Sequence, residues 1–229
     1  MTIAEKITRA KTDYDEVYEA GKKAEYDRFW DNYQSKGEVV NYTGAFHGLR
    51  WDNEVFTPKY DIKPSNAYMM FRESNIKGDL VEILSALGVK LDFSACTILQ
   101  YTFTLCRITR IGTVYAPKAV ELADTFSYSY YLETIDKIII GENQRCNNSC
   151  FHSCSALKNI TFEGIIGNSI NFQWCPLSKA SITNIIEHLS GTATGQTCTF
   201  NKAAKETAFT DDEWSALIGT KTNWTFSLV

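Results

Sequence analysis

Three cysteines and a histidine lie together in one short segment of the chain. Cys146, Cys150 and Cys154 are spaced by four residues, and His152 lies between the last two. Three thiolates and one imidazole form a recognised ligand set for zinc. Zinc-binding cysteines usually come in closer pairs, however, and this segment has none. The spacing therefore favours burial in the core over metal binding, with a disulfide or redox role as the remaining alternative.

Nucleophilic catalysis would require a serine or cysteine held beside a general base. The three histidines, His47, His152 and His188, belong to no recognisable nucleophile motif. The sequence also has no phosphate-binding glycine loop and no paired-histidine metal motif. We therefore predict that the protein is not an enzyme and that it holds no catalytic residue, metal or other cofactor.

An aromatic run, Phe126-Ser127-Tyr128-Ser129-Tyr130-Tyr131, has the composition of a binding loop. Tyrosine supplies a large contact area at low entropic cost, and serine supplies adaptable hydrogen bonding. We predict that Tyr128, Tyr130 and Tyr131 bind a protein or stack on a sugar ring. The alternative is that they cover the edge of the core or form an aromatic ladder with Tyr101.

The composition of the chain limits the class of protein to which these residues can belong. The chain has 229 residues, a formal net charge of −4 and 44% hydrophobic residues, which are values typical of a soluble globular protein. The absence of a basic excess argues against nucleic-acid binding. No run is apolar enough for a signal peptide or a membrane helix, so we expect no membrane insertion.

An internal repeat organises the middle of the chain. Phenylalanine recurs at steps of 23 and 25 residues, at Phe103, Phe126 and Phe151. Isoleucine recurs at steps of 24 and 25 residues, at Ile111, Ile135 and Ile160. Phe46 and Phe71 extend the phenylalanine series upstream. A period of this length is the signature of leucine-rich repeats, whose stacked units share one continuous core.

The two ends of the chain differ from this repeat. Residues 3 to 35 have heptad-like spacing and predict one long helix, which could pack on its own domain or serve as a stalk for oligomerisation. Residues 176–229 predict a helix from Ser178 to Gly191, a strand at 196–200, a capped helix over 210–219 and a last strand at 224–229. We thus expect an α+β fold: an N-terminal helix (1–37), a leucine-rich-repeat-like solenoid of short strands (38–175) and an α/β cap (176–229).

The repeated unit resembles that of the BspA-like leucine-rich repeat proteins. The resemblance is carried by Thr102-Phe103 with Cys106, by Thr125-Phe126 with Leu132, and by Phe151 with Cys154 and Leu157. The layout is also similar to that of proteins of gut Firmicutes and their prophages, in a leader segment like residues 20–30, a segment like 58–62, and an ending with Pro176, Trp214 and Trp224. This resemblance implies surface adhesion, host-molecule binding or a role in a virion.

From these features we expect a non-catalytic recognition or adhesion module. The expected setting is a phage or prophage tail, baseplate or fibre, located in the virion or outside the cell after lysis. Its partner would be a protein or a surface carbohydrate, with a homo-oligomer formed through the N-terminal helix. The alternatives are a protein-binding scaffold in the cytoplasm, or a cell-surface adhesin exported without a classical signal.

Overall fold

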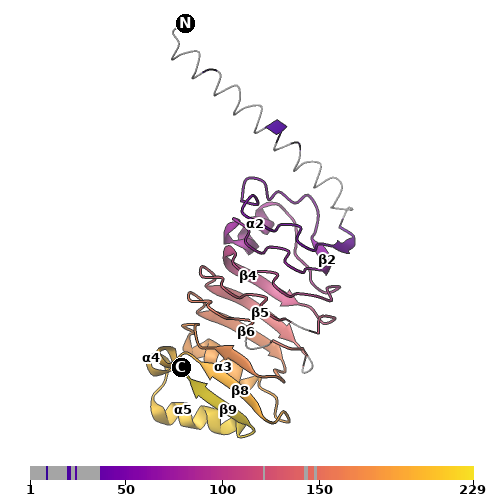
Figure 1. Ribbon diagram of the computed structural model, residues 1–229. Helices are drawn as coiled ribbons and strands as arrows, with labels where there is room; N and C mark the ends of the chain where they lie inside the picture. Colours follow the sequence, from indigo (N-terminus) through magenta and orange to yellow (C-terminus); the bar gives the residue numbers. More distant parts are fainter. Residues whose placement is uncertain are drawn as a thin grey trace.

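The computed structural model shows a mixed α/β fold built on parallel strands. It describes residues 37–120, 122–141, 144–146 and 149–229, together with Arg9, Ala20, Gly21 and Ala24. The helix predicted over residues 3 to 35, and with it the predicted stalk, lies outside the described residues. Within the described part, four α-helices accompany strands that follow one another along the molecule in chain order (Figure 1).

Three parallel sheets make up the strand layer. The strand order is β1-β2 in the first sheet, β3-β4-β5-β6 in the second and β7-β8-β9 in the third. The strands are β1 (Val39–Asn41), β2 (Lys63–Asn66), β3 (Lys77–Asp79), β4 (Arg107–Tyr115), β5 (Thr134–Ile140), β6 (Asn159–Gly164), β7 (Ile170–Phe172), β8 (Gln196–Phe200) and β9 (Trp224–Leu228). Since neighbours in each sheet are consecutive in sequence, each connection returns the chain to start the next strand beside the last.

The isoleucine repeat sets the register of the second sheet. Ile111 of β4 pairs with Ile135 of β5, which pairs in turn with Ile160 of β6. All three side chains are buried. This register agrees with the 24- and 25-residue spacing of the three isoleucines, because residues in register on parallel strands point to the same face.

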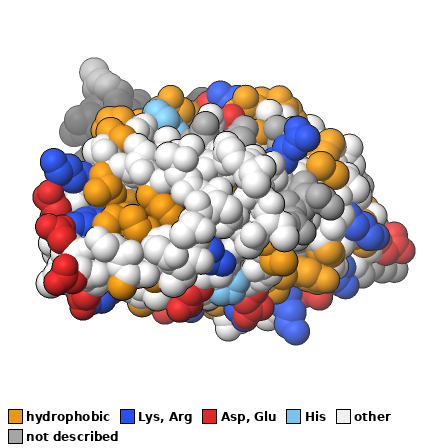
Figure 2. Space-filling model, turned by 90° about the horizontal axis from the view of Figure 1, so that it is seen from below, with side chains coloured by type: hydrophobic (Ala, Val, Ile, Leu, Met, Phe, Trp, Pro, Cys, Tyr) orange, Lys and Arg blue, Asp and Glu red, His pale blue; other side chains and the backbone are white. Residues whose placement is uncertain are grey.

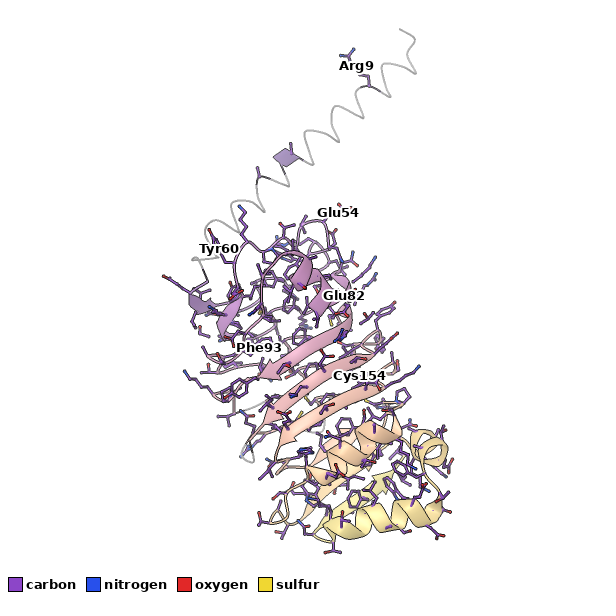
Figure 3. All side chains as sticks on the ribbon, turned by 180° about the vertical axis from the view of Figure 1, so that it is seen from behind. Arg9, Glu54, Tyr60, Glu82, Phe93 and Cys154 are labelled. Atoms are coloured by element: carbon purple, nitrogen blue, oxygen red, sulfur yellow. The ribbon has the colours of Figure 1, made fainter. Side chains whose placement is uncertain are left out.

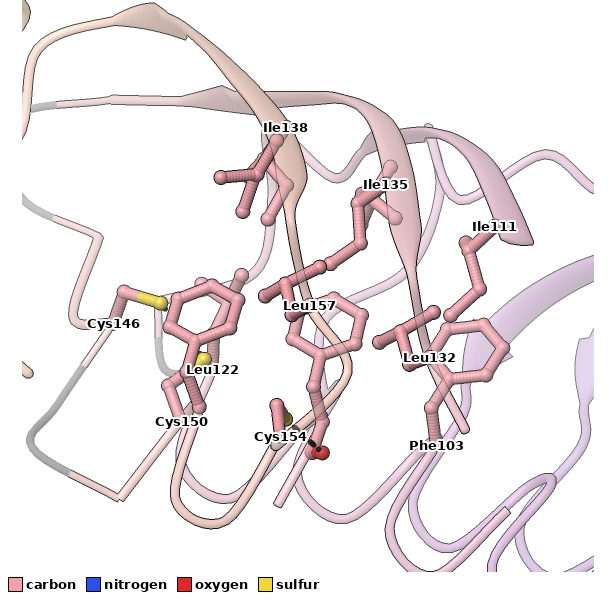
Figure 4. Close-up of a cluster of buried hydrophobic side chains, with 14 of the residues drawn as sticks. Phe103, Ile111, Leu122, Leu132, Ile135, Ile138, Cys146, Cys150, Cys154 and Leu157 are labelled. Atoms are coloured by element: carbon pink, nitrogen blue, oxygen red, sulfur yellow. Dashed lines mark hydrogen bonds between the residues drawn. The ribbon is translucent and has the colours of Figure 1, made fainter. Parts of the chain in front are cut away.

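A column of phenylalanines runs through the core opposite these strands. Neighbouring rings along the column lie between 4.8 and 5.9 Å apart, centroid to centroid. The column consists of Phe46, Phe71, Phe103, Phe126, Phe151, Phe172 and Phe200, all buried. The close-up in Figure 4 shows Phe103 against the leucine and isoleucine side chains of the neighbouring units. The five repeated phenylalanines predicted from the sequence therefore lie in one stack, which Phe172 and Phe200 extend into the third sheet.

Helices close the faces and ends of the sheets. They are α2 (Leu80–Ala86), α3 (Lys179–Glu187), α4 (Lys202–Ala208) and α5 (Asp211–Ile218). α2 contacts β3 and β4, and α3 contacts β6, so the two helices lie toward opposite ends of the second sheet (Figure 3). α3 also supplies hydrogen-bond acceptors to two amides of β6. The Ile160 amide donates to the Ser181 hydroxyl at 2.9 Å, and the Phe162 amide donates to Asn184 Oδ1 at 2.6 Å.

The predicted helix boundaries are largely confirmed. Ser178 caps α3, and Thr210 with Glu213 forms the capping box of α5, which ends at Gly219. α3 ends at Glu187, four residues before the predicted Gly191, and α4 was not predicted. The third sheet also begins at β7, ahead of the expected cap boundary at residue 176.

The C-terminal end of the molecule is formed by β9 and α5. Figure 2 views this end and shows a patch of hydrophobic side chains surrounded by uncharged surface, with charged side chains toward the margin. Trp224 belongs to the core of this part: it is buried, and its Nε1 donates a hydrogen bond of 2.8 Å to the Ser190 carbonyl. None of the helices in the described ranges is long and apolar enough to cross a membrane.

Candidate recognition surface

The turns that carry the phenylalanine column share one hydrogen-bonding pattern. We call the segments centred on Phe46, Phe71, Phe103, Phe126 and Phe151 the Phe turns. In the first four of these turns the amide of the central phenylalanine donates to the next turn, as Phe103 does to the Thr125 carbonyl at 2.7 Å and Phe126 to the Cys150 carbonyl at 3.1 Å. This pattern fixes which residues of successive turns lie side by side.

The Phe turns also repeat an uncommon backbone conformation. The residues two before and two after the central phenylalanine have positive φ in the turns of Phe71, Phe103 and Phe126. They are Met69, Glu73, Tyr101, Leu105, Asp124 and Tyr128, with φ between 53° and 60°. A left-handed non-glycine residue costs about 1 kcal/mol, so the stacked neighbours must stabilise each turn. Tyr128 therefore projects from a backbone that its neighbours hold in place.

The residue three positions after Phe126, Phe151 and Phe172 is a small hydrogen-bond donor. Ser129 donates to the Phe103 carbonyl at 2.5 Å, Cys154 to the Phe126 carbonyl at 3.0 Å, and Cys175 to the Phe151 carbonyl at 3.6 Å. Figure 4 shows Cys154 with this bond drawn. Cys154, which was predicted to be buried in the core, thus also satisfies a buried carbonyl.

The cysteine cluster does not form a metal site in the part of the chain that the structure describes. No group of three or more histidine, cysteine or acidic residues there is placed to hold a metal ion. All seven cysteines are buried free thiols. Burial raises the pKa of Cys106 to about 11, so this thiol stays protonated at neutral pH. Protonated thiols suit packing and hydrogen donation, and are poor nucleophiles.

Aromatic side chains from three successive units meet on the outer surface of these turns. The ring of Tyr128 lies 6.3 Å from Tyr130 and 4.9 Å from His152, whose ring lies 6.2 Å from Trp174. Tyr128, Tyr130 and Trp174 are 40%, 50% and 51% exposed. We call Tyr128, Tyr130, His152 and Trp174 the aromatic strip. The strip consists of three exposed rings and the half-buried ring of His152, held on a regular backbone, which is the arrangement a binding surface needs.

The tyrosines predicted to bind are exposed, and two of the three belong to this strip. Tyr131 is also exposed, but among the described residues its ring has no aromatic neighbour. Tyr101 is not part of the strip, since its ring pairs with Tyr68 at 5.9 Å and lies under the Arg72 guanidinium at 5.7 Å. The predicted ladder of Tyr128 with Tyr101 is therefore wrong.

The serines of the aromatic run are not on the surface. Ser127 and Ser129 are buried, and their hydroxyls donate to the Asp124 and Phe103 carbonyls. The expectation that they supply adaptable hydrogen bonds to a partner is therefore wrong. They serve the turn itself, because a tight left-handed turn leaves carbonyls that need local donors.

Polar groups beside the strip come from other residues. The Ser153 hydroxyl lies 3.1 Å from His152 Nδ1. Burial raises the pKa of the Asp124 carboxyl, although a hydrogen bond from Ser127 and the nearby charge of His152 oppose this shift. The strip thus combines aromatic faces with a hydroxyl, an imidazole and a carboxyl group. His152 and Trp174 were not predicted as binding residues, although both follow a column phenylalanine by one or two positions, as Tyr128 does.

A separate groove lies between α2 and β4. It has a volume of about 500 Å³ and is lined mainly by apolar side chains, among them Leu80, Leu84, Phe93 and Ile111. Lys90 is the one charged residue in its lining. The groove suits an apolar side chain or small apolar ligand, and no residue predicted to bind from the sequence lies in it.

Comparison of the chain with models of protein families, with curated proteins and with solved structures gives no match. The function therefore has to be inferred from the surfaces of the chain itself. Of these, the aromatic strip contains Tyr128 and Tyr130, which the sequence had already indicated, and it joins residues of successive turns.

Proposed function

We propose that the chain is a leucine-rich-repeat-like solenoid and acts as a non-catalytic recognition module through the aromatic strip. The solenoid is supported by the parallel registers Ile111–Ile135–Ile160 and by the unbroken phenylalanine column. Stacked units of this kind present equivalent positions at regular intervals, and so build extended binding surfaces.

The observation that carries the binding role is the row of rings from Tyr130 through Tyr128 and His152 to Trp174. Exposed aromatic groups in a cluster lose little conformational entropy on binding and contribute a large contact area. The hydroxyl of Ser153 and the carboxyl of Asp124 lie in the turns beside them. A ligand with both apolar faces and hydroxyl groups matches this composition, so we favour a surface carbohydrate over a protein.

The proposed setting is a phage or prophage virion, where the module would attach to the host surface. This setting rests on the resemblance of the repeated unit to BspA-like proteins, at Thr102-Phe103 with Cys106 and at Phe151 with Cys154. The helix predicted from the sequence of residues 3 to 35 would join copies of the chain to one another or to the particle. A protein-binding scaffold inside the cell is the alternative use of the same strip.

A binding assay on whole cells tests the recognition role. The fluorescently labelled full chain is incubated with a panel of intact Gram-positive gut bacteria, and bound protein is measured by flow cytometry. We expect Trp174→Ala and Tyr128→Ala to reduce binding at least about tenfold, because interface aromatics of this kind each contribute 2 kcal/mol or more. Tyr115→Ala is the matched control, since Tyr115 is 44% exposed but lies at the end of β4, outside the strip.

Two treatments of the cells separate the candidate ligands. Periodate oxidation of sugars should abolish binding if the ligand is a carbohydrate, whereas protease treatment should abolish it if the ligand is a protein. Equal binding by the Trp174→Ala variant and the unaltered chain would refute the role of the strip. Mass spectrometry of purified particles and of cytosol from uninfected cells then distinguishes the virion from the scaffold.

A further inference from the structure

Two buried thiols lie in direct contact beneath the turn that carries His152. The Sγ atoms of Cys146 and Cys150 are 2.8 Å apart, and both side chains are at most 2% exposed. This separation exceeds the S–S bond length of about 2.05 Å by less than 1 Å. Figure 4 shows both sulfur atoms among the hydrophobic side chains of the core. From this contact we infer that Cys146 and Cys150 form an intramolecular disulfide when the protein meets a low-molecular-weight disulfide such as oxidised glutathione.

The other thiols are engaged differently. Cys96 donates to the Ile98 carbonyl at 3.1 Å, and Cys106 lies 3.4 Å from the Ser129 hydroxyl. Cys175 lies near Cys154, but each of these two directs its thiol to a phenylalanine carbonyl of the preceding unit. Forming a disulfide between them would remove two hydrogen bonds from buried carbonyls, whereas Cys146 and Cys150 contact each other.

The chemistry is a thiol–disulfide exchange in two steps. The Cys146 thiolate attacks one sulfur of the oxidant, which forms a mixed disulfide and releases one thiol. The Cys150 thiolate then attacks the Cys146 sulfur of that mixed disulfide, so that the Cys146–Cys150 bond forms and a second thiol leaves. The protein loses two protons and two electrons, and one molecule of the oxidant is reduced to two thiols.

Cys146 is the better placed residue for the first step. Arg145, which precedes Cys146 in the chain, is exposed. Two hydrogen bonds attach it to the preceding unit: the Arg145 amide donates to the Val120 carbonyl, and the Leu122 amide donates to the Arg145 carbonyl. Burial raises the pKa of Cys150, which makes its thiolate scarce and disfavours it as the group that attacks the oxidant. Local opening of the Cys146 segment is therefore the step that admits the oxidant.

The cross-link would act on the aromatic strip through the backbone. The Cys150 carbonyl accepts the Phe126 amide, and the next residues along the chain are Phe151 of the column and His152 of the strip. Closing a short loop at Cys150 would reduce the freedom of the unfolded chain and restrict opening of this turn. We expect the oxidised protein to have the higher melting temperature.

The experiment uses the folded full-length chain incubated with oxidised glutathione. Remaining thiols are alkylated with iodoacetamide in denaturant, and the protein is digested with trypsin and chymotrypsin. Cleavage after Arg145 and Phe151 releases a fragment, residues 146–151, that contains both cysteines and excludes Cys154. We expect this fragment to lack alkylation and to weigh two hydrogen atoms less than its reduced form, while the other five of the seven cysteines are alkylated.

Variants give this result its control. Cys198→Ser removes an isolated thiol and should still give the cross-linked fragment, whereas Cys150→Ser should leave Cys146 alkylated or joined to glutathione. Circular dichroism checks that each variant is folded, and the unaltered chain alone decides the outcome if Cys150→Ser does not fold. Alkylation of both cysteines in fragment 146–151 of the unaltered chain, or a first cross-link between Cys154 and Cys175, would overturn the inference.

Discussion

Replacing Phe126 by alanine tests the phenylalanine column at its most enclosed point. Phe126 is fully buried, and its ring is stacked between Phe103 at 5.7 Å and Phe151 at 5.3 Å, nearly parallel to both. A buried phenylalanine replaced by alanine costs about 3–5 kcal/mol, and the upper part of this range is expected where aromatic pairs, each worth about 0.5–1.5 kcal/mol, are lost with the ring. Because Phe126 takes part in two such pairs, we expect a loss of about 4–5 kcal/mol of unfolding free energy.

Urea unfolding followed by circular dichroism measures this loss. Leu105→Ala is the matched control, because Leu105 is 39% exposed and lies in the preceding Phe turn. We expect the control to change the unfolding free energy by about 0.5 kcal/mol or less, as exposed positions usually do. A loss below about 2 kcal/mol for Phe126→Ala would contradict the reasoning, since it would mean that the column can close around the missing ring.

Three further predictions concern single positions. Urea unfolding of two cysteine variants should give different results. Cys154→Ser should change the unfolding free energy by less than about 1 kcal/mol, because serine already fills this position in the preceding unit. Cys198→Ser should cost about 1–3 kcal/mol, because it buries a hydroxyl without an acceptor among the described residues. Gly164→Ala should cost at least about 2 kcal/mol on the same assay, because φ is +92° and the added Cβ would lie 1.9 Å from the Ile140 carbonyl oxygen. The hydrogen bond and charge of Lys179 lower the pKa of Glu213. This pair therefore stabilises the fold above the ordinary carboxyl pKa, and its contribution is lost as the pH falls through the lowered pKa. The urea midpoints at pH 6 and pH 3 should differ less in Lys179→Met than in the unaltered chain.

The repeated positions could be predicted because their spacing carries the information. Ile111, Ile135 and Ile160 are in register because each unit must bury its apolar face on the next. The caps of α3 and α5 were equally visible, since Ser178 and Thr210 satisfy amide groups of their own helices. These features depend on residues near in sequence or on a fixed period, and both can be read without a structure.

The features that escaped prediction depend on exceptions to such patterns. α4 has only a weak apolar pattern, because its buried position is Lys205, which is paired with Asp211, and the other residues packed on the core are the small Ala204 and Ala208. The aromatic strip joins Tyr128 to His152 and Trp174 across different units, and these residues do not share a single offset from the phenylalanines. The contact of Cys146 with Cys150 likewise depends on the path of a loop that no repeat specifies.

The left-handed residues of the Phe turns bear on how the chain begins to fold. In the turn of Phe46 the two equivalent positions are Gly44 and Gly48, whose amides donate to the Tyr68 and Arg72 carbonyls. Glycine adopts positive φ without a steric penalty, so this turn alone among the described Phe turns can take its shape before a neighbour supports it. The turns of Phe71, Phe103 and Phe126 each hold two left-handed non-glycine residues, so their shape depends on the neighbours stacked against them.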